Sequence, residues 1–104
     1  MDAKARKALR TIQDCVASGR YIVLAHFVQR MDVRGLFWPD IQAVIDSAQV
    51  VRDDGPDRLR RVKWRVRGRT TDRLDLEIVC ALDRDQRGNL TVFITAYWDR
   101  GNRR

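Results

Sequence analysis

The sequence predicts an α+β domain in which two to three N-terminal helices pack on a three- to four-stranded antiparallel sheet. Apolar residues recur with a helical period as far as Ala48, and they alternate with polar residues in the second half. Clusters of turn residues divide that second half into segments with hairpin-length connections, and such short connections join antiparallel strands. The 104 residues suffice for one domain with a buried core, so we expect a single domain over residues 1–104.

Three segments of the first half have helical spacing, and residues that start or stop helices mark their ends. Asp2 is a suitable N-cap for a helix over residues 2–18, and Gly19 is a natural stop after it. A second helix over residues 25–34 also ends at a glycine, and Pro39 suits the first turn of a third helix. The apolar face of the third helix comprises Ile41, Val44, Ile45 and Ala48.

Alternation of apolar and polar residues marks the strands of the second half. An extended piece begins at Val50-Val51, and strands are predicted over residues 61–67, 74–78 and 91–98. Turns are predicted at residues 53–57, 68–73 and 83–89. In the last strand, one face is expected to carry Val92, Ile94 and Ala96, and the other Thr91, Phe93, Thr95 and Tyr97. Residues 99–104 are expected to fray.

The composition is strongly basic. Lysine and arginine number 21 against 14 aspartates and glutamates, which gives a formal net charge of +7 and a pI of about 10.4. A surface of this sign attracts polyanions, so the expected partners are nucleic acid first, an anionic membrane second and acidic small ligands third.

Several classes of protein are excluded by the sequence. The longest unbroken apolar run, Tyr21 to Ala25, has about five residues, whereas a membrane span needs roughly 20. The charged N-terminus does not resemble a secretory signal, so we expect a cytoplasmic protein with reduced thiols. Cys15 and Cys80 lie far apart and His26 is the only histidine, so we expect neither a metal site nor a cofactor.

The predicted strand over residues 61–67 carries a cation at every second position, namely Arg61, Lys63, Arg65 and Arg67. These side chains point the same way about 6.6 Å apart, a spacing close to the phosphate repeat of an extended single strand. Two interpretations remain: contact with nucleic acid, or a solvated face partly paired with Asp75 and Glu77 on the next strand. Because two acids cannot neutralise four bases, the pattern favours nucleic acid.

A second candidate is the stripe that His26, Arg30 and Arg34 form at helical spacing. The arginines would bind a phosphate beside the imidazole, although a lone histidine is more often structural than catalytic. Thr95 and Tyr97, on one face of the last strand, would complete such a site if that strand is central. The alternative for Tyr97 is an aromatic residue at the edge of the core.

The run from His26 to Gly35, H-F-V-Q-R-M-D-V-R-G, resembles an H-x-x-x-R-M-x-x-R-G core typical of the bacterial domain of unknown function family 4258. Further matches are Asp40-Ile41 with Val44-Ile45, and the C-terminal Thr95-Ala96-Tyr97. The resemblance covers roughly residues 22–98. One departure is Phe37-Trp38-Pro39 in place of small or polar helix-capping residues, which predicts an exposed aromatic pair in contact with a partner.

That family is similar to the RelE/MqsR-like group, whose members are toxins of toxin–antitoxin pairs that cut messenger RNA without a metal. The resemblance therefore implies a RelE-like fold and a metal-independent endoribonuclease, an mRNA interferase that cleaves by 2′-hydroxyl attack. It implies RNA, including ribosome-bound mRNA, and an antitoxin protein as partners.

For such a reaction we expect His26 to act as base or acid and Tyr97 as the weaker proton-transfer partner. Arg30, Arg34 and Arg65 are expected to stabilise charge at the reacting phosphate. The expected RNA-binding residues are Arg61, Lys63, Arg67 and Thr95. Two alternatives remain: a non-catalytic nucleic-acid-binding module of the same fold, and a partner protein whose basic face docks an acidic antitoxin-like chain.

Overall fold

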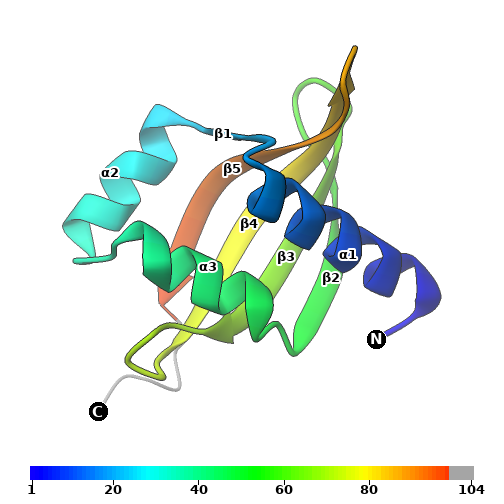
Figure 1. The fold of residues 1–104 in the computed structure, drawn as a ribbon. Helices are drawn as coiled ribbons and strands as arrows, with labels where there is room; N and C mark the ends of the chain where they lie inside the picture. The colour runs from blue at the N-terminus through cyan, green and yellow to red at the C-terminus, as the bar shows by residue number, and fades with distance from the viewer. Residues whose placement is uncertain (99–104) are drawn as a thin grey trace.

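The computed structural model describes residues 1–98 as three helices and a five-stranded mixed sheet (Figure 1). The predicted fraying of the tail concerns residues 99–104, which lie outside the described residues. The elements in chain order are α1 (Ala3–Ser18), β1 (Tyr21–Val23), α2 (Ala25–Val33), α3 (Trp38–Asp46), β2 (Val50–Pro56), β3 (Val62–Arg69), β4 (Asp75–Asp85) and β5 (Gly88–Trp98). None of the helices in residues 1–98 is long and apolar enough to cross a membrane.

The helix ends lie where the sequence predicts them. The Asp2 side chain accepts a hydrogen bond from the Ala5 amide at 2.7 Å and so caps the start of α1. Gly19 ends this helix with a φ of 74°, a left-handed conformation that glycine adopts without steric cost. Pro39 lies in the first turn of α3, as its fixed φ favours.

The α+β class is confirmed, but the sheet is larger and less regular than a purely antiparallel one. Its strand order is β1-β5-β4-β3-β2, and β1 pairs with β5 in parallel at one edge. Three residues are too short to display a period of two, so the sequence pattern shows Tyr21–Val23 only as an apolar piece. The prediction of three to four antiparallel strands was therefore wrong in strand number and in the direction of one pair.

The hairpin turns are shorter than predicted because the strands continue into them. Strand β2 extends through the expected turn to Pro56, with a β-bulge between Asp53 and Pro56. The turn itself is organised by Asp57, whose Oδ1 accepts the amides of Leu59 and Arg61 at 2.9 and 2.8 Å. Asp54 consequently lies on a strand beside the basic strand β3 rather than in a loop.

A second irregularity lies in β5, where a bulge changes which residues share a face. Val79 of β4 pairs with Thr95 but the next residue, Cys80, pairs with Phe93, so Ile94 is the extra residue. Phe93 and Ala96 both face the core, whereas Val92 lies opposite Ala81 on the other face. The expected alternation along residues 91–97 was wrong across this point, because a bulge shifts the parity of the strand.

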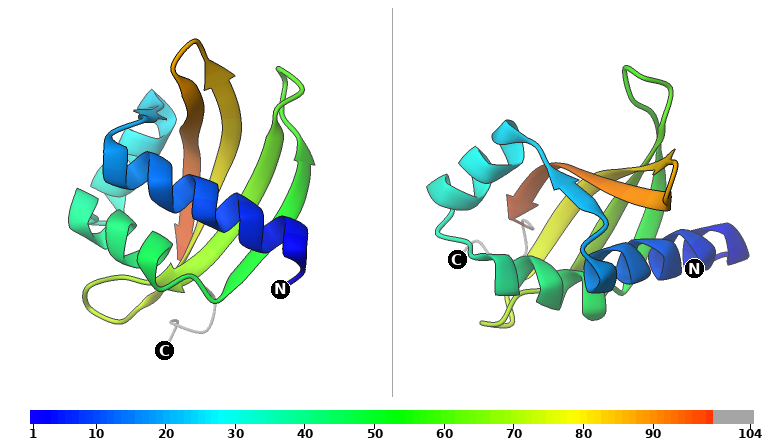
Figure 2. Two further views of the ribbon diagram at one scale, coloured as in Figure 1. Left: turned by 45° about the vertical axis from the view of Figure 1, so that its right-hand side comes forward. Right: turned by 45° about the horizontal axis from the view of Figure 1, so that its top comes forward.

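The hydrophobic core lies between the helices and one face of the sheet (Figure 2). Helices α1 and α3 cross that face, and α2 packs beside β5. Trp38 stacks on Tyr21 with ring centroids 4.7 Å apart, and both contact Phe93. Phe37 is 73% exposed, so the predicted exposed aromatic pair is a single exposed phenylalanine. The opposite face of the sheet has no helix over it in residues 1–98, and we call it the open face.

The Asp40 carboxylate joins the start of α3 to the β3–β4 connection. It accepts the Phe37 amide at 3.0 Å, and the Thr71 hydroxyl and amide at 2.5 and 3.2 Å. Burial alone would raise the pKa of Asp40, but these hydrogen bonds outweigh it and hold the pKa below the ordinary 3.8. The ionised carboxylate therefore stabilises the fold above that ordinary value, and this contribution is lost as the pH falls through the lower pKa of the folded state.

We expect Asp40→Ala to lower the free energy of unfolding by about 2 kcal/mol at pH 7, because three donors lose their acceptor. Urea denaturation at pH 7 and at successively lower pH measures this difference between variant and parent. The difference should shrink as the pH falls through the pKa of the folded state, and Asp40→Asn, which keeps one oxygen acceptor, should lie between the two. A difference that stays constant with pH would contradict the ionised role of Asp40.

Candidate nucleic-acid interface

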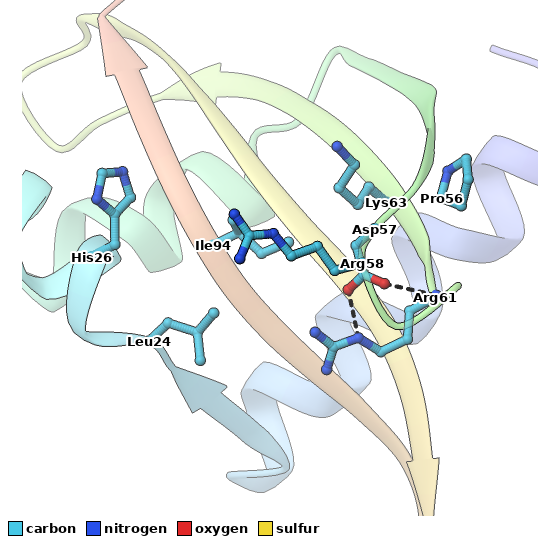
Figure 3. A pocket seen from close by; sticks show the side chains of 8 residues that line it. All are labelled: Leu24, His26, Pro56, Asp57, Arg58, Arg61, Lys63 and Ile94. Carbon is cyan, nitrogen blue, oxygen red and sulfur yellow. Dashed lines mark hydrogen bonds and ion pairs between the residues drawn. The ribbon is translucent and has the colours of Figure 1, made fainter.

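A hollow of about 580 Å³ lies on the open face of the sheet. Its walls are the start of α2, the β2–β3 hairpin and the bulged part of β5 (Figure 3). The lining residues are Leu24, His26, Pro56, Asp57, Arg58, Arg61, Lys63 and Ile94. The hollow therefore brings His26 together with Arg61 and Lys63, two of the cations of the predicted strand over residues 61–67; in the structure Arg61 directly precedes β3.

His26 lies in the first turn of α2 with an exposed side chain. Its Nε2 is 3.3 Å from the hydroxyl oxygen of Thr95, which is itself buried. The β5 bulge at Ile94 sets the parity that points Thr95 to the open face, where the imidazole can meet it. This hydrogen bond orients the ring through one nitrogen. Because His26 is exposed, the imidazole is not enclosed by aliphatic side chains.

The cations of β3 are held by carboxylates across the open face. Arg65 Nε lies 2.7 Å from Asp54 Oδ1, and its Nη1 lies 3.6 Å from Glu77 Oε1. Lys63 Nζ lies 3.5 Å from the other oxygen of Asp54, and Arg61 Nε lies 2.6 Å from Asp57 Oδ2. The expectation that only two acids could reach this strand was wrong, because β2 carries Asp54 to it and the hairpin turn adds Asp57.

The ion pair between Asp54 and Arg65 favours the charged forms of both groups. Burial raises the pKa of Asp54, but the hydrogen bond and charge of Arg65, with the charge of Lys63, lower it below 3.8 overall. The same hydrogen bond, which Arg65 donates to Asp54, raises the pKa of Arg65. Part of the charge of Arg65 and Lys63 is therefore compensated by Asp54.

Tyr97 lies on the open face two residues beyond Thr95. Its side chain is 41% exposed, and the Arg65 guanidinium carbon lies 5.8 Å from its ring centroid. Tyr97 pairs with Glu77 across β4 and β5, outside the lining of the hollow. Tyr97 therefore lies on the open face and not at the edge of the core, and its part in a site with His26 stays a prediction.

The two arginines of the helical stripe do not line the hollow. Arg30 is half-buried one turn after His26 on α2. Arg34 caps the end of this helix, and its Nε is buried without a hydrogen-bond partner in residues 1–98. Arg67 lies on the open face further along β3, in register with Glu77. The structure thus gathers His26, Thr95, Arg61 and Lys63, with Arg65 and Tyr97 further along the same face.

Arg58 is a member of the hollow that the sequence analysis did not select. It lies in the hairpin turn after Asp57, its side chain is exposed, and Figure 3 shows it reaching over the sheet in front of Ile94. No ion pair engages it within the described part of the chain, in contrast to the cations on β3. The signal in the sequence was its position between the predicted turn at residues 53–57 and the basic strand over residues 61–67.

Within residues 1–98, no group of three or more histidine, cysteine, aspartate or glutamate residues could hold a metal ion. Cys15 and Cys80 are both buried, and neither forms a disulfide bond. Burial raises the pKa of Cys80 to about 12, which leaves it as an unreactive thiol. The groups that line the hollow are one imidazole, the Asp57 carboxylate and the guanidinium and ammonium cations, and the Thr95 hydroxyl contacts the imidazole.

Comparison with known proteins identifies the family but no individual relative. The sequence pattern of the family described as "Domain of unknown function (DUF4258)" matches residues 23–98, which agrees with the resemblance seen over residues 22–98. No curated protein and no solved structure matches the chain. The match spans most of the sequence and includes both His26 and Tyr97. The chain therefore belongs to the DUF4258 family.

Proposed function

We propose that this protein binds single-stranded RNA on the open face of its sheet and cleaves it without a metal ion. The observation that supports the proposal is the exposed imidazole of His26, oriented by Thr95 at the rim of a hollow that Arg58, Arg61 and Lys63 also line. An imidazole fixed through one nitrogen leaves the other for proton transfer, and the cations attract the phosphate.

The proposed reaction is an internal transfer at phosphorus. The 2′-oxygen attacks the neighbouring phosphorus while His26 accepts the hydroxyl proton. The bond from phosphorus to the 5′-oxygen breaks, and that oxygen takes a proton from the Tyr97 hydroxyl. The products are a 2′,3′-cyclic phosphate and a 5′-hydroxyl end; His26 then releases its proton to solvent, and solvent returns a proton to tyrosine.

The spacing along β5 suits this division of roles. Thr95 and Tyr97 point to the same side of the strand about 6.6 Å apart, so the imidazole at Thr95 and the phenol can flank one phosphodiester. Arg58 and Lys63 would bind the phosphate from the hairpin side, and Arg65 beside Tyr97 would stabilise the leaving oxygen.

In the cell, such an activity fits the toxin of a bacterial toxin–antitoxin pair, a RelE-like mRNA interferase in the cytoplasm whose antitoxin masks the open face. The test is to incubate the 104-residue protein with a labelled single-stranded RNA, with and without a chelator. We expect chelator-resistant cleavage that leaves cyclic-phosphate ends, and slowed growth on expression. Intact RNA under all conditions, or cleavage that the chelator abolishes, would contradict the proposal.

A second candidate is a non-catalytic RNA-binding module, and the ion pairs of the open face favour it. Asp54, Asp57 and Glu77 compensate the cations of β3, which lowers the charge available for stabilising a transition state. The cleavage test separates the two candidates, because this one predicts salt-dependent RNA binding without any cyclic-phosphate product.

The ion pairs of Asp54 with Lys63 and Arg65 should weaken the binding of RNA to the open face, and this effect can be measured. We expect Asp54→Asn to tighten the binding of single-stranded RNA by roughly fivefold, because Arg65 and Lys63 lose a shared carboxylate and gain charge for phosphates. Fluorescence anisotropy with labelled 2′-O-methyl RNA, which lacks the attacking hydroxyl, measures this. The control is Asp14→Asn on the outer surface of α1, which should leave affinity unchanged within about twofold. Weaker binding by Asp54→Asn would place RNA elsewhere.

A further inference from the structure

A second hollow, of about 380 Å³, lies on the opposite side of the sheet from the first. It is bounded by the N-terminal half of α1 and by the ends of β3, β4 and β5 that are near the hairpin turns. In the left view of Figure 2 the strands continue past α1, so no helix covers their ends near the hairpin turns. We call this hollow the α1 groove.

The floor of the α1 groove is apolar. Val62 is 40% exposed, and Leu82 is half-buried where it packs against the hydrophobic core. Trp64 lies beneath them with only 4% of its surface exposed. Val62 and Leu82 are therefore aliphatic side chains that a partner could cover, and their burial would remove apolar surface from water.

The rim of the α1 groove is basic. Lys4 and Lys7 line it from α1, and Arg84 lines it from β4. Within residues 1–98 the side chains of these three cations form no ion pair, and no carboxylate lines the groove. The open face differs in this respect, because Asp57 compensates Arg61 and Asp54 compensates Lys63 and Arg65.

We propose that the α1 groove binds an acidic, amphipathic peptide segment of a partner protein. An apolar side chain of that segment covers Val62 and Leu82, and flanking carboxylates pair with Lys4, Lys7 and Arg84. Charge complementarity selects this occupant, since three uncompensated cations surround an apolar floor. RNA is disfavoured because aliphatic side chains offer no stacking partner for bases, and the indole of Trp64 is buried.

This inference goes beyond the proposed ribonuclease function, because it needs neither the open face nor cleavage. The groove and the first hollow lie on opposite sides of the sheet, so a peptide in the groove leaves the face of His26 accessible. A partner that binds here would hold the protein without blocking RNA from it.

The test uses the full 104-residue protein and a panel of fluorescein-labelled 12-residue peptides. Each peptide combines glutamate with leucine, with leucines spaced either two apart or at helical spacing, and a matched set carries glutamine for glutamate. We expect at least one glutamate peptide to bind in anisotropy titrations, and its glutamine counterpart to bind at least about tenfold more weakly.

The decisive variant is Lys4→Glu with Lys7→Glu, which should weaken binding of that peptide by about tenfold. Its matched control is Arg6→Glu with Arg10→Glu on another side of α1, which makes the same change of net charge outside the groove. Circular dichroism checks that both variants keep their helices.

Three outcomes would overturn the proposal. The first is that no glutamate peptide binds, and the second is that the two double variants weaken binding equally. The third is that Lys4→Glu with Lys7→Glu weakens binding of labelled 2′-O-methyl RNA more than binding of the peptide. None of these measurements depends on cleavage, so failure here and failure of the ribonuclease proposal are distinguishable.

Discussion

Replacing His26 with alanine should reduce the rate of RNA cleavage by roughly 10²- to 10⁴-fold, the range that a positioned general base contributes. The imidazole lies in the first hollow, its Nε2 within 3.3 Å of the Thr95 hydroxyl, and it is the only histidine of the chain. The other proton-accepting side chain that lines the hollow is the Asp57 carboxylate, which already accepts a hydrogen bond from Arg61. Removal of the imidazole therefore removes the base.

The same variant should bind 2′-O-methyl RNA within about twofold of the parent, because the cations that line the hollow are unchanged. Single-turnover cleavage of labelled RNA measures the rate, and added imidazole should restore part of it to His26→Ala. The matched control is Gln29→Ala, an exposed position on the same helix, which should cleave at the rate of the parent. If His26→Ala cleaves as fast as Gln29→Ala, the assignment of the base is wrong.

A fall in RNA affinity as large as the fall in rate would have a different meaning. It would show that His26 supports the shape of the hollow through Thr95 instead of taking a proton. Thr95 is buried beneath the ring, so loss of the imidazole exposes a hydroxyl and not an apolar cavity. We therefore expect the first hollow to keep its shape in His26→Ala, so that the cleavage rate falls while the RNA affinity stays close to that of the parent.

The helices were predictable because their signals are local. Asp2, Gly19 and Pro39 act on backbone groups within four residues of themselves, and each does in the structure what its chemistry favours in any helix. The run from His26 to Gly35 is likewise a contiguous pattern, which is why the family could be predicted from it.

The details of the sheet were not predictable because they depend on residues far apart in the chain. The parallel pairing of Tyr21–Val23 with Thr91–Phe93 joins segments about 70 residues apart. The sequence of neither segment indicates which strand it pairs with. No glycine or proline near Ile94 indicates the bulge in the sequence. Only the pairing with β4 reveals the extra residue and the shift of parity that follows from it.

The candidate site shows the same division. Helical spacing correctly placed His26 and Arg30 one turn apart, but spacing does not say how the helix docks. The start of α2 borders the first hollow, while Arg30 and Arg34 lie outside its lining. The number of carboxylates on the open face was underestimated for a related reason. Residues 53–57 are rich in turn-forming residues, so the sequence predicted a turn where β2 extends to Pro56.

Gly68 is the position where a single methyl group should cost the most stability. It was predicted to begin a turn, but it lies inside β3 on the core face, opposite Leu76 and directly beneath α3. A Cβ at this position would overlap the backbone carbonyl of Val44 and come within 2.9 Å of Ser47 Oγ. Because backbone atoms cannot rotate away, α3 must move as a unit.

Movement of α3 would also break its attachment to β3. Ser47 Oγ accepts the Arg69 amide at 2.8 Å and donates to the Arg69 carbonyl at 3.2 Å, and both bonds require the close approach that glycine permits. We therefore expect Gly68→Ala to lower the free energy of unfolding by about 3 kcal/mol, and the melting temperature by roughly 15 °C. Urea and thermal denaturation followed by circular dichroism measure both values.

The control for Gly68→Ala is Gly19→Ala, where the reason for glycine is conformational instead of steric. Gly19 has a φ of 74° and open space around the position of a Cβ, so alanine there should cost only about 1 kcal/mol. The two variants add the same atom, and the difference between them measures the close contact of α3 with β3. Equal costs would mean that α3 shifts freely on the sheet, and that the hydrogen bonds of Ser47 do not fix its position.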